Sequence, residues 1–127
     1  MPPEAGSPED WLRFAESDLE IAEAGASGRV MLEMLCFHAQ QAVEKSIKAV
    51  LLATGVEFPR THNLKTLLEL VPPAVPRPPD LNRAAGLSDY AVVARYPGEH
   101  EPVTEDEYRE ALRLAEAVVR WAREQIV

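Results

Sequence analysis

Apolar and small residues recur at steps of three and four between Arg29 and Thr54, a stretch without glycine or proline. These steps place them on one side of an α-helix. The apolar positions are Leu32, Leu35, Cys36, Ala39, Ala42, Val43, Ile47, Val50 and Ala53. At about 1.5 Å per residue such a helix spans roughly 39 Å, the thickness of a small domain. The pattern therefore predicts a long central helix with one side packed inward.

The other side of this predicted helix is polar, because His38, Gln41, Lys45 and Lys48 follow the same spacing. Glu44 can pair with Lys48, since residues four apart are neighbours on a helix surface. This polar row is either a face wetted by solvent or a contact for phosphate, a nucleotide or a partner. The spacing leaves both interpretations open.

Helix-starting signals lie on both sides of the central stretch. Ser7 followed by Pro8 predicts a helix over residues 8–24, because serine caps a helix N-terminus and proline fits its first position. Thr104 and Glu107 form a capping box, which predicts a last helix running to the C-terminus. The first and central helices are joined by a short glycine-bounded turn, so we expect them to pack antiparallel.

Two more helices are predicted between the central and last ones. Asn63 or Thr61 caps a short helix, and a fourth runs from about Asp80 to Tyr96. The prolines of residues 72–79 exclude helix and strand, so they predict a stiff connector inside the domain. No segment alternates apolar and polar residues as a strand does. We therefore expect an all-α protein, an up-down bundle of four to five helices.

Length and composition fit one soluble domain over residues 1–127, with residues 1–7 as a frayed lead-in. Cys36 is the only cysteine, and we expect it to be a small buried hydrophobe rather than a nucleophile. No secretory signal or membrane-spanning run is present, which predicts a cytoplasmic protein without membrane attachment. The formal net charge of −8 disfavours tight non-specific binding of RNA or DNA, although a local basic cluster can still bind a short RNA.

The histidines offer little metal chemistry. His38, His62 and His100 do not form a zinc-ligand pattern, so we predict no metal site and no cofactor. We expect a capping or packing role for His62. Arg95 and His100, however, are separated by four residues across a predicted helix break. A guanidinium can hold a phosphate and an imidazole can move protons near neutral pH, which together suffice for metal-free RNA cleavage. A structural arginine at a helix end gives the same pattern.

Two stretches resemble the HEPN family, the higher-eukaryote and prokaryote nucleotide-binding domain. FHAQQAVEKSIKAVLLATGVEFPRTHNLKTLLEL is similar to the signature half of the family, an A-x-Q-x-A-E-K-x-hydrophobic-K helix followed by a P-R-T-H-x-L turn. LSDYAVVARYPG and the alanine-rich helix after it resemble the closing half. The similarity runs from about Trp11 to Ala122. It implies a helical bundle that pairs into a homodimer or higher homo-oligomer.

The resemblance also implies an activity and a partner. In HEPN toxins, an R-x4-6-H motif from each subunit meets across the dimer cleft and forms a metal-independent ribonuclease, which implies catalytic roles for Arg95 and His100. Similar small proteins are often encoded beside a minimal nucleotidyltransferase, which restrains them as an antitoxin. This chain departs from the toxin pattern, with Tyr96 where a polar residue such as asparagine usually follows the arginine, and Pro102 where some toxins carry a tyrosine.

Three functions therefore remain open. The first is a ribonuclease, and the second is a non-catalytic dimer that binds a nucleotidyltransferase. The third is a nucleotide-binding module in which Lys45, Lys48 or Arg95 contacts phosphate. The candidate residues for contacts with phosphate, a nucleotide or a partner are His38, Gln41, Lys45, Lys48 and Tyr96.

Overall fold

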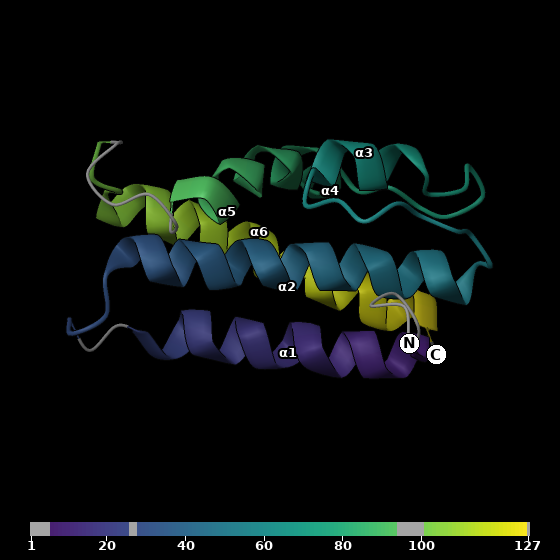
Figure 1. Ribbon diagram of the computed structural model, residues 1–127, viewed down its shortest axis with the longest axis horizontal. Helices are drawn as coiled ribbons and strands as arrows, with labels where there is room; N and C mark the ends of the chain where they lie inside the picture. Colours follow the sequence, from purple (N-terminus) through teal and green to yellow (C-terminus); the bar gives the residue numbers. More distant parts are fainter. Residues whose placement is uncertain (1–5, 26–27, 94–100, 127) are drawn as a thin grey trace.

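The computed structural model describes residues 6–25, 28–93 and 101–126, and within these ranges it contains helices and connecting segments but no strand. The elements in chain order are α1 (Pro8–Ala24), α2 (Leu32–Ala53), α3 (Leu64–Glu69), α4 (Pro79–Arg83), the 3₁₀ helix η2 (Ala84–Asp89), α5 (Tyr90–Val93) and α6 (Glu105–Ile126). Figure 1 shows α1, α2 and α6 running along the length of the molecule, with the shorter helices on the side of α2 away from α1. The predicted all-helical fold is confirmed.

Capping boxes start both α1 and α6. The sequence predicted the box at α6, whereas for α1 it predicted only the N-cap role of Ser7. Ser7 Oγ accepts a hydrogen bond from the backbone N–H of Asp10 at 3.0 Å, and the Asp10 carboxylate accepts one from the Ser7 N–H at 3.3 Å. Thr104 Oγ accepts from the Glu107 N–H at 3.1 Å, and Glu107 Oε1 accepts from the Thr104 N–H at 2.9 Å. These bonds satisfy amide groups that a helix start leaves without an intrahelical partner.

The hairpin of α1 and α2 is antiparallel, as predicted (Figure 1). Gly25, at the end of α1, allows the two helices to approach closely. A Cβ atom at this position would lie 2.1 Å from Leu35 Cδ2, and Leu35 is only 1% exposed. Only a residue without a side chain fits there.

The hydrophobic core lies between α1, α2 and α6, and the short helices close it on one side. Its largest fully buried apolar side chains are Leu35, Ile47, Leu51, Leu64, Leu67, Leu81, Val43, Val50, Val118 and Val119. Small residues such as Ala22, Ala39 and Ala115 let the long helices lie close together. The buried Tyr108 hydroxyl donates a hydrogen bond to the Ala22 carbonyl at 2.5 Å, which fixes the start of α6 against the end of α1.

The connector predicted over residues 72–79 contains neither helix nor strand as far as residue 78. Pro79 is instead the first residue of α4, a position that proline fits. Two side chains attach the connector to its neighbours, one from α6 and one from the connector itself. Trp121 Nε1 of α6 donates to the Pro76 carbonyl at 2.7 Å. Arg77 Nη2 of the connector donates to the carbonyls of Leu68 at 2.6 Å and Val71 at 2.9 Å, at the C-terminal end of α3. The connector is thereby attached to α3 and α6.

The predicted start of the central helix differs from the structure. The central helix α2 begins at Leu32 rather than Arg29, with Met31 as its N-cap. It is as long as α6, since both have 22 residues.

The predicted fourth helix is not continuous, because η2 interrupts it between α4 and α5. Gly86 and Ser88 lie in this interruption, and both residue types are weaker helix formers than alanine. Ser88 Oγ also accepts a hydrogen bond from the Leu64 N–H at 2.9 Å, so it caps α3. The 3₁₀ segment is thus attached to α3 by a hydrogen bond from another part of the chain.

Candidate functional site

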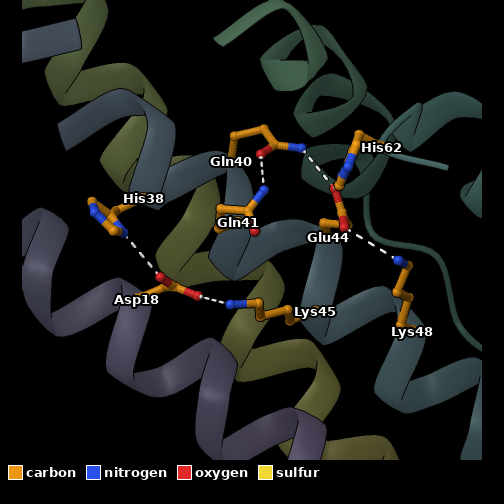
Figure 2. A network of polar contacts seen from close by, with 8 residues as sticks. All are labelled: Asp18, His38, Gln40, Gln41, Glu44, Lys45, Lys48 and His62. Atoms are coloured by element: carbon orange, nitrogen blue, oxygen red, sulfur yellow. Dashed lines mark hydrogen bonds and ion pairs between the residues drawn. The ribbon is translucent and has the colours of Figure 1, made fainter. Parts of the chain in front are cut away.

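The polar row of α2 begins with an ion pair to α1. Asp18 of α1 accepts a hydrogen bond from Lys45 Nζ at 2.6 Å through Oδ2, and its Oδ1 lies 2.9 Å from His38 Nδ1 (Figure 2). An ionised carboxylate only accepts hydrogen bonds, so His38 donates from Nδ1. Asp18 is 7% exposed. One buried carboxylate therefore joins the first helix to two residues of the second.

Glu44 is the centre of a second group of contacts. Its Oε1 accepts a hydrogen bond from Gln40 Nε2 at 3.1 Å and lies 2.8 Å from His62 Nδ1. Its Oε2 accepts from Lys48 Nζ at 3.2 Å. Gln41 extends the group by donating to Gln40 Oε1 at 2.7 Å, as Figure 2 shows. A charge this deeply buried needs such partners, because desolvation otherwise disfavours it strongly.

The ammonium group of Lys48 is buried beside two aromatic rings. Its Nζ lies 5.5 Å from the centroid of the Trp11 ring and 5.6 Å from that of Phe58. Lys45 Nζ lies 5.8 Å from the centroid of the Phe14 ring. Cations within about 6 Å of a ring face are attracted by its electrons. Because Lys48 is 5% exposed, the interpretation of the row as a solvent-wetted face is wrong at this position.

A pocket of about 340 Å³ opens beside these contacts. We call it the Glu44 pocket, and it is lined by Trp11, Glu44, Lys45, Lys48, Arg60, Thr61 and His62. Helices α1 and α2 and the segment after α2 all contribute to it. Its lining holds three basic side chains, those of Lys45, Lys48 and Arg60, and one carboxylate, that of Glu44. Its volume is at the lower end of the roughly 300–1,000 Å³ found for small-molecule sites.

The predicted contact residues divide into two sets. His38, Gln41, Lys45 and Lys48 all belong to the contacts around Asp18 and Glu44, and only the two lysines line the Glu44 pocket. The predicted catalytic residues Arg95 and His100, together with Tyr96, lie outside the described residues.

Sequence reasoning missed Asp18, Gln40 and Arg60 as members of this region. Asp18 had a signal, because it is an acid on the otherwise apolar stripe of the first helix. Arg60 also had a sequence signal, because it belongs, like His62, to the P-R-T-H turn on which the family resemblance depends. Gln40 had none, since it looks like any polar residue of the central helix.

Cys36 has no role in this chemistry. It is fully buried, and burial raises the pKa of its thiol to about 12, so the unreactive protonated form is favoured. The prediction of a buried structural cysteine is confirmed. Within the described residues, no three or more side chains of the histidine, cysteine or acidic types are grouped so as to bind a metal ion. Nor does any helix there have the length and apolar character needed to span a membrane.

Comparison with known families identifies the chain. The family model described as the HEPN domain matches residues 8–125. The chain belongs to the HEPN family. The solved structures agree with this HEPN assignment. The protein TT1696 from Thermus thermophilus is 35% identical, with a TM-score of 0.81 over 93% of this chain and 97% of that chain.

A second similar structure is ST0689, an archaeal HEPN homologue. It is 32% identical, with a TM-score of 0.76 over 97% of this chain and all (100%) of that chain. No curated protein gives a significant match. The HEPN resemblance seen in the two sequence stretches is therefore confirmed.

Proposed function

We propose that this HEPN protein is one component of a two-gene system with a minimal nucleotidyltransferase, and that it cleaves RNA without a metal ion. Arg95 and His100 carry the cleavage. The observation that supports this function is the R-x4-H motif in the segment between α5, which ends at Val93, and the capped start of α6 at Thr104. Catalytic residues commonly lie on such segments between rigid elements.

The described histidines support the choice of His100 as the proton-transfer group. His38 Nδ1 contacts the Asp18 carboxylate, and His62 Nδ1 contacts that of Glu44. Both rings thus already have a carboxylate partner. In addition, the Val103 N–H lies 3.4 Å from Glu33 Oε2, so the chain after the motif is attached to the first turn of α2.

The proposed reaction uses two Arg95–His100 pairs, one from each chain of a homodimer. One imidazole takes the proton of the RNA 2′-hydroxyl, and the 2′-oxygen then attacks the adjacent phosphorus. The other imidazole protonates the leaving 5′-oxygen as its bond to phosphorus breaks. Arg95 stabilises the additional negative charge of the transition state. The products are a 2′,3′-cyclic phosphate end and a 5′-hydroxyl end.

The alternative is a non-catalytic dimer that serves as a partner or nucleotide-binding subunit of the nucleotidyltransferase. Two sequence features favour it. Tyr96 stands where HEPN toxins usually carry a small polar residue after the arginine, and a net charge of −8 repels RNA at long range. In this case the nucleotidyltransferase, rather than RNA, is the main ligand of the chain.

The two functions are separated by an RNA cleavage assay in the presence of a chelator. We expect the wild type to produce 2′,3′-cyclic phosphate ends, and His100→Ala and Arg95→Ala to lose most of this activity. Glu101→Ala is the matched control, because it removes a charge beside the motif and keeps both catalytic groups. Circular dichroism checks that each variant is folded.

A wild type that cleaves no RNA, or a His100→Ala variant that cleaves as fast as the wild type, overturns the ribonuclease. Co-purification with a nucleotidyltransferase encoded by a neighbouring gene then supports the non-catalytic alternative. Growth arrest on expression of the wild type alone, relieved by His100→Ala, supports the ribonuclease.

A further inference from the structure

A shallow groove of about 520 Å³ lies between η2, with the adjoining ends of α4 and α5, and the first half of α6. We call it the η2–α6 groove. On the α6 side it extends over the eight positions from Asp106 to Leu114, about 12 Å at 1.5 Å per residue. This length matches roughly two turns of a helix. The groove is lined by Arg83, Gly86, Leu87, Tyr90, Asp106, Glu107, Glu110, Ala111 and Leu114.

The floor of the groove is apolar. Leu87 of η2 and Ala111 and Leu114 of α6 are at most 5% exposed and belong to the hydrophobic core. The half-buried Tyr90 packs against this core and lines the groove beside them. Gly86 contributes no side chain, and a Cβ atom there would have no neighbour within 4 Å. The groove is therefore open above η2 and has space for side chains of another molecule.

The rim of the groove on the α6 side is acidic. Asp106 is exposed, and its side chain has no hydrogen bond or ion pair in the part of the chain that the structure describes. Arg109, three positions further along the helix, pairs with Glu105 at 3.5 Å instead. Glu107 accepts the N–H of Thr104, which orients its carboxylate without neutralising the charge.

The arginines near the groove are already paired with acids. Glu110 accepts hydrogen bonds from Arg113 at 2.8 and 3.0 Å. Arg113 also contacts Asp80 at 3.2 and 3.3 Å, and Asp80 lies 3.5 Å from Arg83. When every ion-pair partner is counted, four carboxylates against two guanidinium groups leave a net charge of −2 at the groove. The carboxylates are those of Asp80, Asp106, Glu107 and Glu110, and the guanidinium groups are those of Arg83 and Arg113.

This charge decides between the possible occupants. A negative rim repels RNA phosphates and the anionic headgroups of a membrane. A second copy of the chain, with its net charge of −8, does not complement the rim either. Lysine and arginine side chains do, because their aliphatic stems cover apolar surface while their charged ends reach the carboxylates. Apolar anchors flanked by basic residues are typical of an amphipathic helix that binds in a groove.

We propose that the η2–α6 groove is a docking site for a basic amphipathic helix of a partner protein. The apolar residues of that helix contact Leu87, Tyr90 and Leu114. Its lysine and arginine side chains pair with Asp106 and Glu107, the two carboxylates of the groove that have no cationic partner among the described residues.

The groove borders the segment that carries the R-x4-H motif. Tyr90 belongs to α5, which ends at Val93, and Asp106 belongs to the first turn of α6. A partner helix in the groove therefore lies next to that segment. The inference uses neither Arg95 nor His100, so it stands or fails independently of the proposed RNA cleavage.

Two matched peptides test the docking site. The basic peptide is LRALLRALLRALL with both ends blocked, and the acidic peptide has glutamate in place of each arginine. The Gly86 amide signal, assigned with Gly86→Ala, reports binding in the groove by NMR. The Trp121 indole, which is bonded to Pro76, is the reference. We expect a saturable shift of the Gly86 signal with the basic peptide, weaker binding as salt is raised, and no such shift with the acidic peptide.

Variants of the groove test its charge and its open space. Dissociation constants are measured by fluorescence anisotropy of the labelled basic peptide. We expect Asp106→Asn to raise the constant about threefold to fivefold, as the loss of one exposed ion pair predicts. Gly86→Arg places a cation in the groove without a clash at its Cβ, and we expect an increase of about tenfold or more. Glu69→Gln removes an exposed acid outside the groove and is the matched control, with a change of less than about twofold.

The outcomes separate a specific site from general attraction to an acidic protein. The absence of a saturable Gly86 shift with the basic peptide, or an equal response to the acidic peptide, overturns the proposal. Wild-type affinity in both groove variants, or equal weakening by Glu69→Gln and Asp106→Asn, overturns it as well. A uridine oligonucleotide that shifts the Gly86 signal saturably and displaces the basic peptide would assign the groove to RNA instead. Circular dichroism checks that each variant is folded.

Discussion

At the scale of single residues, Gly25 shows how closely α1 and α2 approach. Its backbone φ of −76° is accessible to any residue, so the glycine is not required for conformational reasons. The requirement is space, because a Cβ atom would lie 2.1–2.7 Å from three side-chain atoms of Leu35. Leu35 is 1% exposed and belongs to the hydrophobic core, so its side chain moves only by displacing other core side chains.

We expect Gly25→Ala to lower the free energy of unfolding by about 1–3 kcal/mol, the usual cost of overpacking a core. Gly86→Ala is the matched control, because a Cβ at Gly86 has no neighbour within 4 Å. We expect the control to leave stability unchanged or to raise it by up to about 1 kcal/mol. Urea unfolding measures both, and equal midpoints for the two variants would contradict the close packing.

The residues around Glu44 show which contacts could be predicted from the sequence and which could not. The pair of Glu44 and Lys48 followed from helical spacing and is present. The burial of Lys48 did not follow, because it depends on Trp11 and Phe58, which come from segments before and after α2. The ion-pair partner of Lys45 could not be predicted either, since Asp18 is 27 positions away in the chain. Spacing within one helix says nothing about which residues other segments bring to it.

At the scale of helices, ends marked by capping residues were predictable and ends set by packing were not. Ser7, Asn63 and Thr104 all accept the expected backbone hydrogen bonds. The start of α2, in contrast, has no side-chain cap hydrogen bond. The interruption at η2 likewise depends on a contact with α3, which no local pattern contains.

The cap of α6 gives a direct prediction. We expect Thr104→Ala to lower the free energy of unfolding by about 0.5–2 kcal/mol, because the Glu107 N–H loses its acceptor. Thr104→Ser keeps the hydroxyl and serves as the control, with an unfolding midpoint near that of the wild type. If thermal unfolding gives the same midpoint for the alanine and serine variants, the cap does not stabilise α6.

At the scale of the whole molecule, the net charge of the chain opposes self-association, whereas its exposed apolar side chains favour it. A net charge of −8 on each chain makes two copies repel. Exposed large apolar side chains nevertheless lie on α1 and around the start of α2. Those among the described residues are Phe14, Ile21, Val30, Met31 and Met34. Burial of such surface favours association, and it does so more strongly when salt screens the charges.

We expect a homodimer in solution, as the proposed cleavage mechanism requires. Light scattering at micromolar concentration should give a mass of about 28 kDa, twice the 14.1 kDa of one chain. Raising the salt concentration should strengthen the dimer, because charge repulsion is screened. A mass of one chain at all salt concentrations would contradict the dimer and with it the shared cleft.

Because Cys36 is buried, its reaction with a thiol reagent can report local opening of the helical bundle. Thiol reagents attack the thiolate, and this thiol is both inaccessible and held protonated by a pKa raised to about 12. Since it is the only cysteine in the chain, any modification by such a reagent occurs at this one position of α2. The rate of modification therefore measures how often α2 separates from the rest of the bundle, without an introduced label.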